Sequence, residues 1–269
     1  MRPTVSLIVN TFQRTFEKVL TPDYFASIQS QNQYPFDNVV LLINNVDDPE
    51  IVHARADELV AAGTVSAYFD VSDVLPRALR ALHLTEKDLG SSPHFSDHLL
   101  VEPFVVTTDY YVHWDADVNL EHPSNWIAPS VALLESEQRV FVASPQQHIR
   151  ERCQWAKKTD EFLFDYTFSD QLFLTRTKQM LEPIYSEWCP ASLRFPLAHE
   201  TTVVEQHLES HIRNQRLWHA FFTGATFTHE GVKWYWPKGP RQAIKFVRNR
   251  IFSRILRYQP FTQNPRWKI

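Results

Sequence analysis

The chain has 269 residues, of which 43% are hydrophobic and 22% charged, a composition typical of a globular protein that excludes global disorder. Its only cysteines, Cys153 and Cys189, are too few for a disulfide framework, so we expect a reducing, cytoplasmic location. The formal net charge is −4, and no apolar run has the length of a membrane-spanning helix, which predicts a protein that is soluble or at most attached to a membrane surface.

The first part of the chain alternates between short apolar runs and helical patterns. The runs are rich in β-branched residues and end in polar ones, as buried parallel strands do. The second helical pattern has Pro49 near its start and Gly63 at its end, the usual punctuation of a helix. This order predicts a parallel sheet with right-handed crossovers. The strands are expected at residues 4–9, 38–45 and 65–71, and the helices at 21–31 and 47–63.

The middle of the chain leads into a motif with two aspartates. A helix is expected near residues 75–84, and a second one within 95–108, where Pro103 should break or end it. The next strand, at 110–114, runs directly into Asp115. Further strands are predicted at 139–145 and 170–177, a helix at 201–215, and a pair of strands within 216–231 that ends at His229.

Polar side chains stand at the ends of several predicted strands. Asn10, Asn44 and Asp115 each follow an apolar run, and ligands of open α/β sheets bind beyond the carboxyl ends of the strands. Asp115 and Asp117 form an Asp-x-Asp triplet, which is either a site for a hard cation or a solvated turn. The chain has only five glycines and no glycine-rich phosphate loop, which disfavours P-loop and dinucleotide-binding interpretations.

The charges are unevenly distributed. Residues 231–269 hold ten lysines and arginines and no acidic residue, which leaves 17 bases and 31 acids, a net charge of −14, in the first 230 residues. Within this tail, Ile244, Val247, Ile251 and Ile255 recur at helical spacing among the bases. Such a helix lies on an anionic membrane surface or packs on the acidic body, and the two alternatives stay open here. Nucleic acid is not an expected partner, because the acidic body would repel it.

Four segments together resemble GT-A fold glycosyltransferases of the family 2 type. The segments TVSLIVNTFQR, VVLLINNVDD and YYVHWDADV are similar to the first strand, the second strand and the metal-binding strand of that family. In VVEQHLESHIRNQRLWHAFFTGATFTHEG, Glu205 stands where the family has the second residue of an acidic pair, and His229 ends the following strand. The resemblance covers residues 4–231 and implies an α/β, GT-A-like nucleotide-sugar-binding fold with a mostly parallel central sheet. We expect that domain at 1–232 and a basic, helical C-terminal extension at 233–269.

The resemblance also assigns roles to individual residues. Asp117 would bind Mn²⁺ or Mg²⁺ directly, Asp115 would contact the ribose or reach the metal through water, and His229 would be the third ligand. Glu205 would be the catalytic base of an inverting displacement. The expected residues of the nucleotide-sugar site are Asn10, Thr11, Arg14, Asn44, Asn45, Asp115 and Asp170. Three features depart from the family. Asn44 or Asn45 replaces an acidic residue, and Val204 replaces the first acid of the pair. His94, Asp97 and His98 occupy the region where an arginine or asparagine often precedes the metal strand.

The function that the resemblance implies is metal-dependent transfer of a sugar from a nucleotide-sugar donor to a glycan or a lipid-linked glycan. A nucleotidyltransferase of similar fold, and a non-catalytic protein that binds a sugar or a membrane surface, are the alternatives. Each assigned residue also has an ordinary structural interpretation. The aspartates could form a polar turn, Glu205 could favour the start of a helix, and His229 could be a half-buried strand residue.

Overall fold

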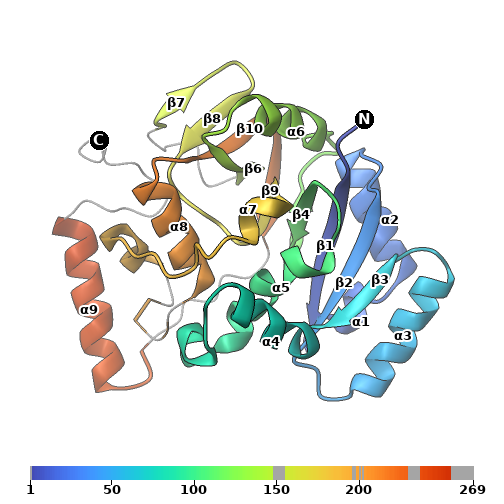
Figure 1. The fold of residues 1–269 in the computed structure, drawn as a ribbon, viewed down its shortest axis with the longest axis horizontal. Coiled ribbons are helices and arrows are strands. Elements are labelled where there is room, and N and C mark those ends of the chain that lie inside the picture. The colour runs from blue at the N-terminus through green and yellow to red at the C-terminus, as the bar shows by residue number, and fades with distance from the viewer. Residues whose placement is uncertain are drawn as a thin grey trace.

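The computed structural model describes residues 2–147, 155–195, 198–199, 201, 203–229 and 237–255 (Figure 1). Within them the chain forms one 10-stranded sheet with helices on both faces. The predicted tail beyond residue 255, and Cys153, lie outside the described residues. The strands are β1 (Val5–Phe12), β2 (Asn38–Asn44), β3 (Ala67–Asp70), β4 (Tyr110–Trp114), β5 (Val118–Leu120), β6 (Val140–Gln147), β7 (Lys157–Lys158), β8 (Phe162–Asp165), β9 (Leu172–Arg176) and β10 (Trp218–His229).

The strand order is β3-β2-β1-β4-β9-β6-β10-β8-β7, and β5 pairs with β10. The first four strands of that order are parallel, β9 runs antiparallel to both of its neighbours, and β10 is parallel to β6. The predicted mixed α/β fold with a mostly parallel central sheet is therefore confirmed. Because β9 is inserted between β4 and β6, the sheet is not a simple series of crossovers.

Helices cover both faces of this sheet. Two of these helices, α2 and α3, start with a proline and have a capping side chain. The hydroxyl of Thr21 caps α2, and the carboxylate of Asp48 caps α3. The helices are α1 (Phe16–Val19), α2 (Pro22–Asn32), α3 (Pro49–Ala61), α4 (Val71–Ala81), α5 (Asp97–Val105), α6 (Ile127–Ser136), α7 (Thr177–Met180), α8 (Val204–Asn214) and α9 (Pro240–Ile255), with 3₁₀ turns η1 (Glu86–Leu89), η2 (Pro93–Phe95) and η4 (Pro190–Arg194).

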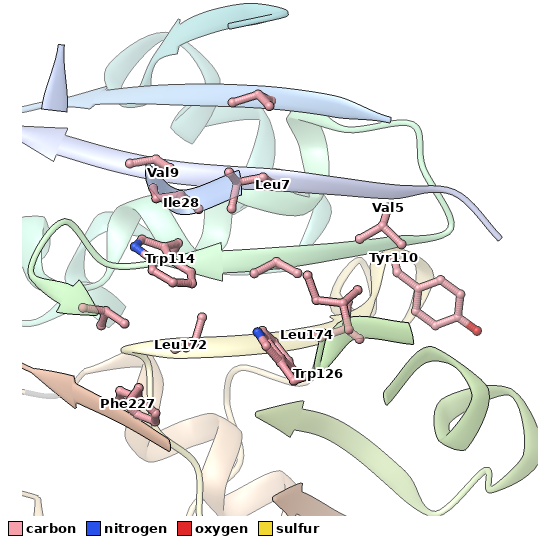
Figure 2. Close-up of a cluster of buried hydrophobic side chains, with 14 of the residues drawn as sticks. Val5, Leu7, Val9, Ile28, Tyr110, Trp114, Trp126, Leu172, Leu174 and Phe227 are labelled. Carbon is pink, nitrogen blue, oxygen red and sulfur yellow. The ribbon is translucent and has the colours of Figure 1, made fainter. Parts of the chain in front are cut away.

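Two apolar cores lie on opposite faces of the sheet, because successive strand residues point to opposite sides. One core contains residues of α2, α3 and α6, and the other contains residues of α4, α5, α7 and α8. Figure 2 shows the first core, where fully buried Trp114 at the end of β4 lies among strand side chains. Its labelled strand residues are Val5, Leu7, Val9, Tyr110, Trp114, Leu172, Leu174 and Phe227.

The predicted elements are present, but some of their bounds differ, and β5, β7 and β8 are additional strands. The strand predicted to end before Asn10 continues to Phe12, and α4 begins at Val71, before the predicted start. α5 contains Pro103 and ends two residues later, at Val105, close to the predicted end. The predicted strand pair within 216–231 is one strand, β10, with a register shift between Phe222 and Thr226. After that shift β10 leaves β8 and pairs with β5, which the sequence analysis did not predict.

Candidate active site

The turn after β4 places the two aspartates. The N–H of Val118 donates to the carbonyl of Asp115 at 3.1 Å, so residues 115–118 form a tight turn between β4 and β5. The backbone N–H of Asp115 donates to the carbonyl of Gln171 at 3.0 Å, which fixes the turn to the segment before β9. Both carboxylates remain partly accessible, with 28% of the Asp115 side chain and 36% of the Asp117 side chain exposed.

β10 brings His229 to these aspartates. In the antiparallel pairing of β5 with β10, His229 lies opposite Val118, the residue after Asp117. Nε2 of His229 lies 2.9 Å from Oδ1 of Asp117. Burial lowers the pKa of His229, but the hydrogen bond and charge of Asp117 outweigh burial and raise this pKa above 6.5. Asp115, Asp117 and His229 each offer one ligand atom, and these atoms lie within 4.8 Å of one another.

The three predicted metal ligands thus form one cluster, and its chemistry fits a divalent cation. Two carboxylates supply the oxygen ligands that Mg²⁺ and Mn²⁺ prefer, and an imidazole suits Mn²⁺ better than Mg²⁺. In the described part of the chain, Nδ1 of His229 is buried without a hydrogen-bond partner. We name Asp115, Asp117 and His229 the aspartate–histidine cluster.

Two further side chains respond to the negative charge of this cluster. Burial and repulsion by Asp115 raise the pKa of Asp170, a predicted site residue, to about 6. Burial and the charges of Asp115 and Asp117 raise the pKa of the Tyr24 phenol well above 10. Tyr24 lies in α2, and no sequence motif marked it. Excess negative charge at this point is what a cation would compensate.

Behind Asp115 lies a row of buried polar residues that the sequence analysis missed. Nε2 of His113 is 3.3 Å from Oδ1 of Asp115, and its Nδ1 bonds the carboxylate of Glu102 in α5. Both His113 and Glu102 are fully buried. Burial alone would lower the pKa of His113, but Glu102 and Asp115 raise it to about 10. His98, one turn before Glu102 in α5, stacks on the His113 ring at a centroid distance of 5.8 Å. The 98/102 spacing, one helical turn, is the only sequence signal that could have found this row.

The other predicted donor-site residues line the same edge of the sheet. Val9 pairs with Trp114, so Asn10 lies level with Asp115 one residue further along the parallel strands. Asn10 Oδ1 is buried without a hydrogen-bond partner in the described residues. Thr11 is fully buried and lies 3.3 Å from the Thr15 hydroxyl, oxygen to oxygen, while Arg14 is exposed, 5.7 Å from the Phe12 ring centroid.

Asn44 and Asn45 differ from each other. Asn44 is buried and donates through Nδ2 to Oδ1 of Asp97 at 2.7 Å, so its amide orients a buried carboxylate. Asn45 is exposed and has a φ of 50°, a left-handed conformation that asparagine tolerates better than most residues. The acidic residue that the family carries after the second strand is absent from β2, but Asp97 of α5 places a carboxylate at the same edge of the sheet.

Glu205 is half-buried in the first turn of α8. The backbone N–H of Val204 donates to Oγ of Ser96 at 2.9 Å. This contact sets the start of α8 against the start of α5, where Asp97 and His98 lie. Glu205 therefore belongs to the same end of the sheet as the aspartate–histidine cluster.

No protein-family profile and no curated protein sequence matches the chain. Among solved structures, GalNAc-T7 with UDP, GalNAc and Mn²⁺ superimposes with a TM-score of 0.51 and 11% identity. The alignment covers 92% of this chain and 47% of that one, so this chain spans about half of its length. The mannosyltransferase PcManGT from Pyrobaculum calidifontis, solved with GDP-Man and Mn²⁺, aligns at a TM-score of 0.48 and 16% identity, over 97% of this chain and 66% of that one. The superposition on GalNAc-T7 shows that the chain has the GT-A fold.

Proposed function

We propose that this protein is a metal-dependent glycosyltransferase that uses a nucleotide-sugar donor. The aspartate–histidine cluster, at the carboxyl end of β4 in a GT-A fold, is the observation that carries the proposal. Its ligands would hold Mn²⁺ or Mg²⁺, which compensates the charge of a departing nucleoside diphosphate. The UDP, GalNAc and Mn²⁺ of the GalNAc-T7 structure support a nucleotide-sugar donor for this chain as well.

In the proposed reaction, different residues bind the donor and activate the acceptor. Asn10, Asp170 and the loop with Asn45 lie where the donor would bind. Glu205 takes the proton of the acceptor hydroxyl as its oxygen bonds to the anomeric carbon. The bond between that carbon and the diphosphate oxygen breaks, and its electron pair leaves with the diphosphate. A single displacement of this kind inverts the anomeric configuration.

The deciding experiment measures Mn²⁺-dependent turnover across a panel of nucleotide sugars, by release of UDP or GDP. Asp117→Ala should lose activity by on the order of 100-fold or more, because a charge-stabilising group is removed at the reacting diphosphate. Asp160→Ala, at an exposed aspartate in the turn before β8, is the matched control and should keep full activity. Equal thermal stability of the two variants would exclude misfolding as the cause.

The same assay tests the alternatives and the base. Glu205→Gln should lower kcat while the KM for the donor stays close to that of the wild type, because the base acts on the acceptor. Nucleotide binding without turnover would favour a non-catalytic protein, and pyrophosphate formation from a nucleoside triphosphate would favour a nucleotidyltransferase. Activity that survives Asp117→Ala would contradict the proposed site.

A lipid-linked acceptor at an anionic membrane is the second part of the proposal, and α9 supports it. This helix packs on the body through Phe246, whose ring contacts His199, and through buried Asn249. Its opposite side exposes four large apolar residues, among five bases and no acid. They are Ile244, Val247, Ile251 and Phe252, exposed by 70%, 55%, 50% and 47%. In the described residues no helix is long and apolar enough to cross a membrane.

A further inference from the structure

A second group of potential ligands lies directly behind the aspartate–histidine cluster. His98 of α5, His113 of β4 and Asp115 each offer one atom, and these atoms lie within 4.8 Å of one another. Side chains of β4 alternate between the two faces of the sheet, so His113 and Asp115 point to the face that α5 covers. Asp115 therefore belongs to both groups, with two carboxylate oxygens to share between them.

The imidazoles of this group are buried, and their nitrogens are incompletely paired. His113 is fully buried and His98 is 7% exposed. In the described part of the chain, Nε2 of His113 and Nδ1 of His98 have no hydrogen-bond partner. Native proteins pair nearly all buried polar atoms, so two unpaired nitrogens beside one carboxylate point to a missing ligand.

A carboxylate stands behind the imidazole of His113. Glu102 bonds Nδ1 of His113, the nitrogen that faces away from Asp115, whereas Asp97 lies 3.8 Å from Nδ1 of His98, beyond hydrogen-bond distance. Asp97 is itself held by the Asn44 amide and by the backbone N–H of His98. Carboxylates that orient the far nitrogen of a metal-binding histidine are the usual outer partners of such sites. In the described residues no lysine or arginine forms a salt bridge with these five side chains, whose ion-pair partners are histidines.

We infer that His98, His113 and Asp115 form a second divalent-cation site, of the zinc class. Two imidazoles and one carboxylate are a common zinc ligand set, with bonds near 2.0–2.1 Å that place tetrahedral ligand atoms about 3.4 Å apart. Nε2 of His113 and Oδ1 of Asp115 are 3.3 Å apart. The side chain of Asp115 is 28% exposed, so this group of ligands is accessible from solvent. This inference concerns metal uptake and holds whether or not the protein transfers a sugar.

The test counts metal ions on the full-length protein, without any nucleotide. After removal of all metal with a chelator, the wild-type protein should take up two equivalents of Zn²⁺, measured by calorimetry and by metal analysis after desalting. The double variant Asp117→Ala/His229→Ala should keep one equivalent, at the inner site. His98→Leu should lose the inner equivalent and keep the other. His94→Leu, at an exposed histidine that also bonds Asp97, is the matched control and should bind two.

A second measurement separates a metal site from a purely structural cluster. X-ray absorption of Zn²⁺ bound to the double variant should show two imidazole ligands, and Glu102→Gln should weaken Zn²⁺ binding roughly 10–100-fold without changing the stoichiometry. One equivalent in the wild-type protein, or two equivalents in His98→Leu, would overturn the inference. Loss of sugar transfer with two ions still bound would refute the proposed function alone.

Discussion

The alternation of side chains along β4 decides which residues reach the site. Tyr110, Val112 and Trp114 enter the core beneath α2 and α6, whereas Tyr111 packs in the core beneath α5. His113 and Asp115 share the side of Tyr111. The β4 segment thus places apolar side chains in the core on one face of the sheet and the potential metal ligands His113 and Asp115 on the other face. A shift of one residue in register would place Asp115 in the apolar core beneath α2 and α6 and Trp114 on the side of His113.

Glu187 is a second residue whose charge matters, far from the cluster. Its carboxylate bonds Nδ1 of His211 at 2.5 Å and Nδ2 of Asn214 at 2.8 Å, both in the last turn of α8. Burial raises the pKa of Glu187, but these hydrogen bonds outweigh burial and lower it below 4.5. The ionised carboxylate therefore holds the end of the helix that carries Glu205.

We predict that Glu187→Gln lowers the free energy of unfolding at pH 7 by about 1–2 kcal/mol, because hydrogen bonds to a charged group are lost. A carboxyl with a lowered folded pKa stabilises the fold above its unfolded pKa, and this contribution disappears as the pH falls from 4.5 through the folded value. Urea unfolding between pH 7 and pH 3 should show a smaller loss in the variant. Exposed Glu182→Gln is the control, and parallel pH curves for all three proteins would contradict the prediction.

At the scale of elements, the end of α2 fastens the segment that follows the aspartates. Oε1 of Gln31 accepts the N–H of Leu120 at 2.8 Å, and the carbonyl of Gln31 accepts the N–H of Ser124 at 2.8 Å. Oδ1 of Asn32 accepts the indole N–H of Trp126 at 2.6 Å, and both side chains are fully buried. Gln31 thus holds the end of β5, which pairs with the end of β10, and Asn32 holds Trp126 in the segment that follows.

We expect Asn32→Leu to lower the free energy of unfolding by about 1–3 kcal/mol, because the indole N–H of Trp126 would stay buried without an acceptor. Thermal and urea unfolding measure this loss. Gln29→Leu, on the exposed side of the same helix, is the matched control and should stay within about 0.5 kcal/mol of the wild type. Equal stability of both variants would show that the Asn32–Trp126 bond contributes nothing.

At the scale of the whole molecule, α9 reverses the usual arrangement of a surface helix. Its side toward the body contains Asn249 and Phe246, and its outward side contains most of its large apolar residues. Figure 1 shows α9 at the margin of the molecule, beyond α8. An anionic bilayer matches this surface in both respects, since the apolar side chains enter the boundary region and the bases meet the headgroups.

Co-sedimentation with vesicles tests that surface. The wild-type protein should bind vesicles that contain phosphatidylglycerol, bind pure phosphatidylcholine weakly, and dissociate at high salt. Ile251→Glu should weaken binding roughly 30-fold, since about 2 kcal/mol of apolar transfer is lost. Ile51→Glu is the matched control, because Ile51 and Ile251 are both 50% exposed. Equal binding by the two variants, or a dimer that Ile251→Glu disrupts, would contradict the membrane proposal.

The parts that the sequence predicted depend on local patterns. The βαβ series of β1, β2 and β3 could be predicted because each strand and helix is a continuous apolar pattern with its own punctuation. Asp115 and Asp117 stood out because a buried strand ends at them. The antiparallel direction of β9 was not predictable, because neighbours far away in the chain determine it. β5 was missed because three residues carry no periodicity.

The buried polar row shows the same limit within the site. The sequence of α5 contains Asp97, His98 and Glu102, which resemble the solvated face of an ordinary helix. They are buried because α5 lies against His113, Asn44 and the start of α8, all distant in sequence. His113 lies within a predicted apolar strand, where nothing in the sequence distinguishes it from an ordinary strand residue. The local sequence does not predict that a charged side chain will be buried, because the partner that makes its burial possible comes from another element.

The pairing of β5 with β10 also has a kinetic consequence. Asn119 and Thr228 are 109 positions apart, so the contact that unites Asp117 with His229 closes a very long loop. Such contacts form slowly, whereas β1, β2 and β3 join through short connections. We expect Mn²⁺ binding to appear only in the last refolding phase, after most helical circular dichroism has returned, and stopped-flow mixing can compare the two signals. A folding intermediate in which β10 has not yet paired with β5 would lack the aspartate–histidine cluster.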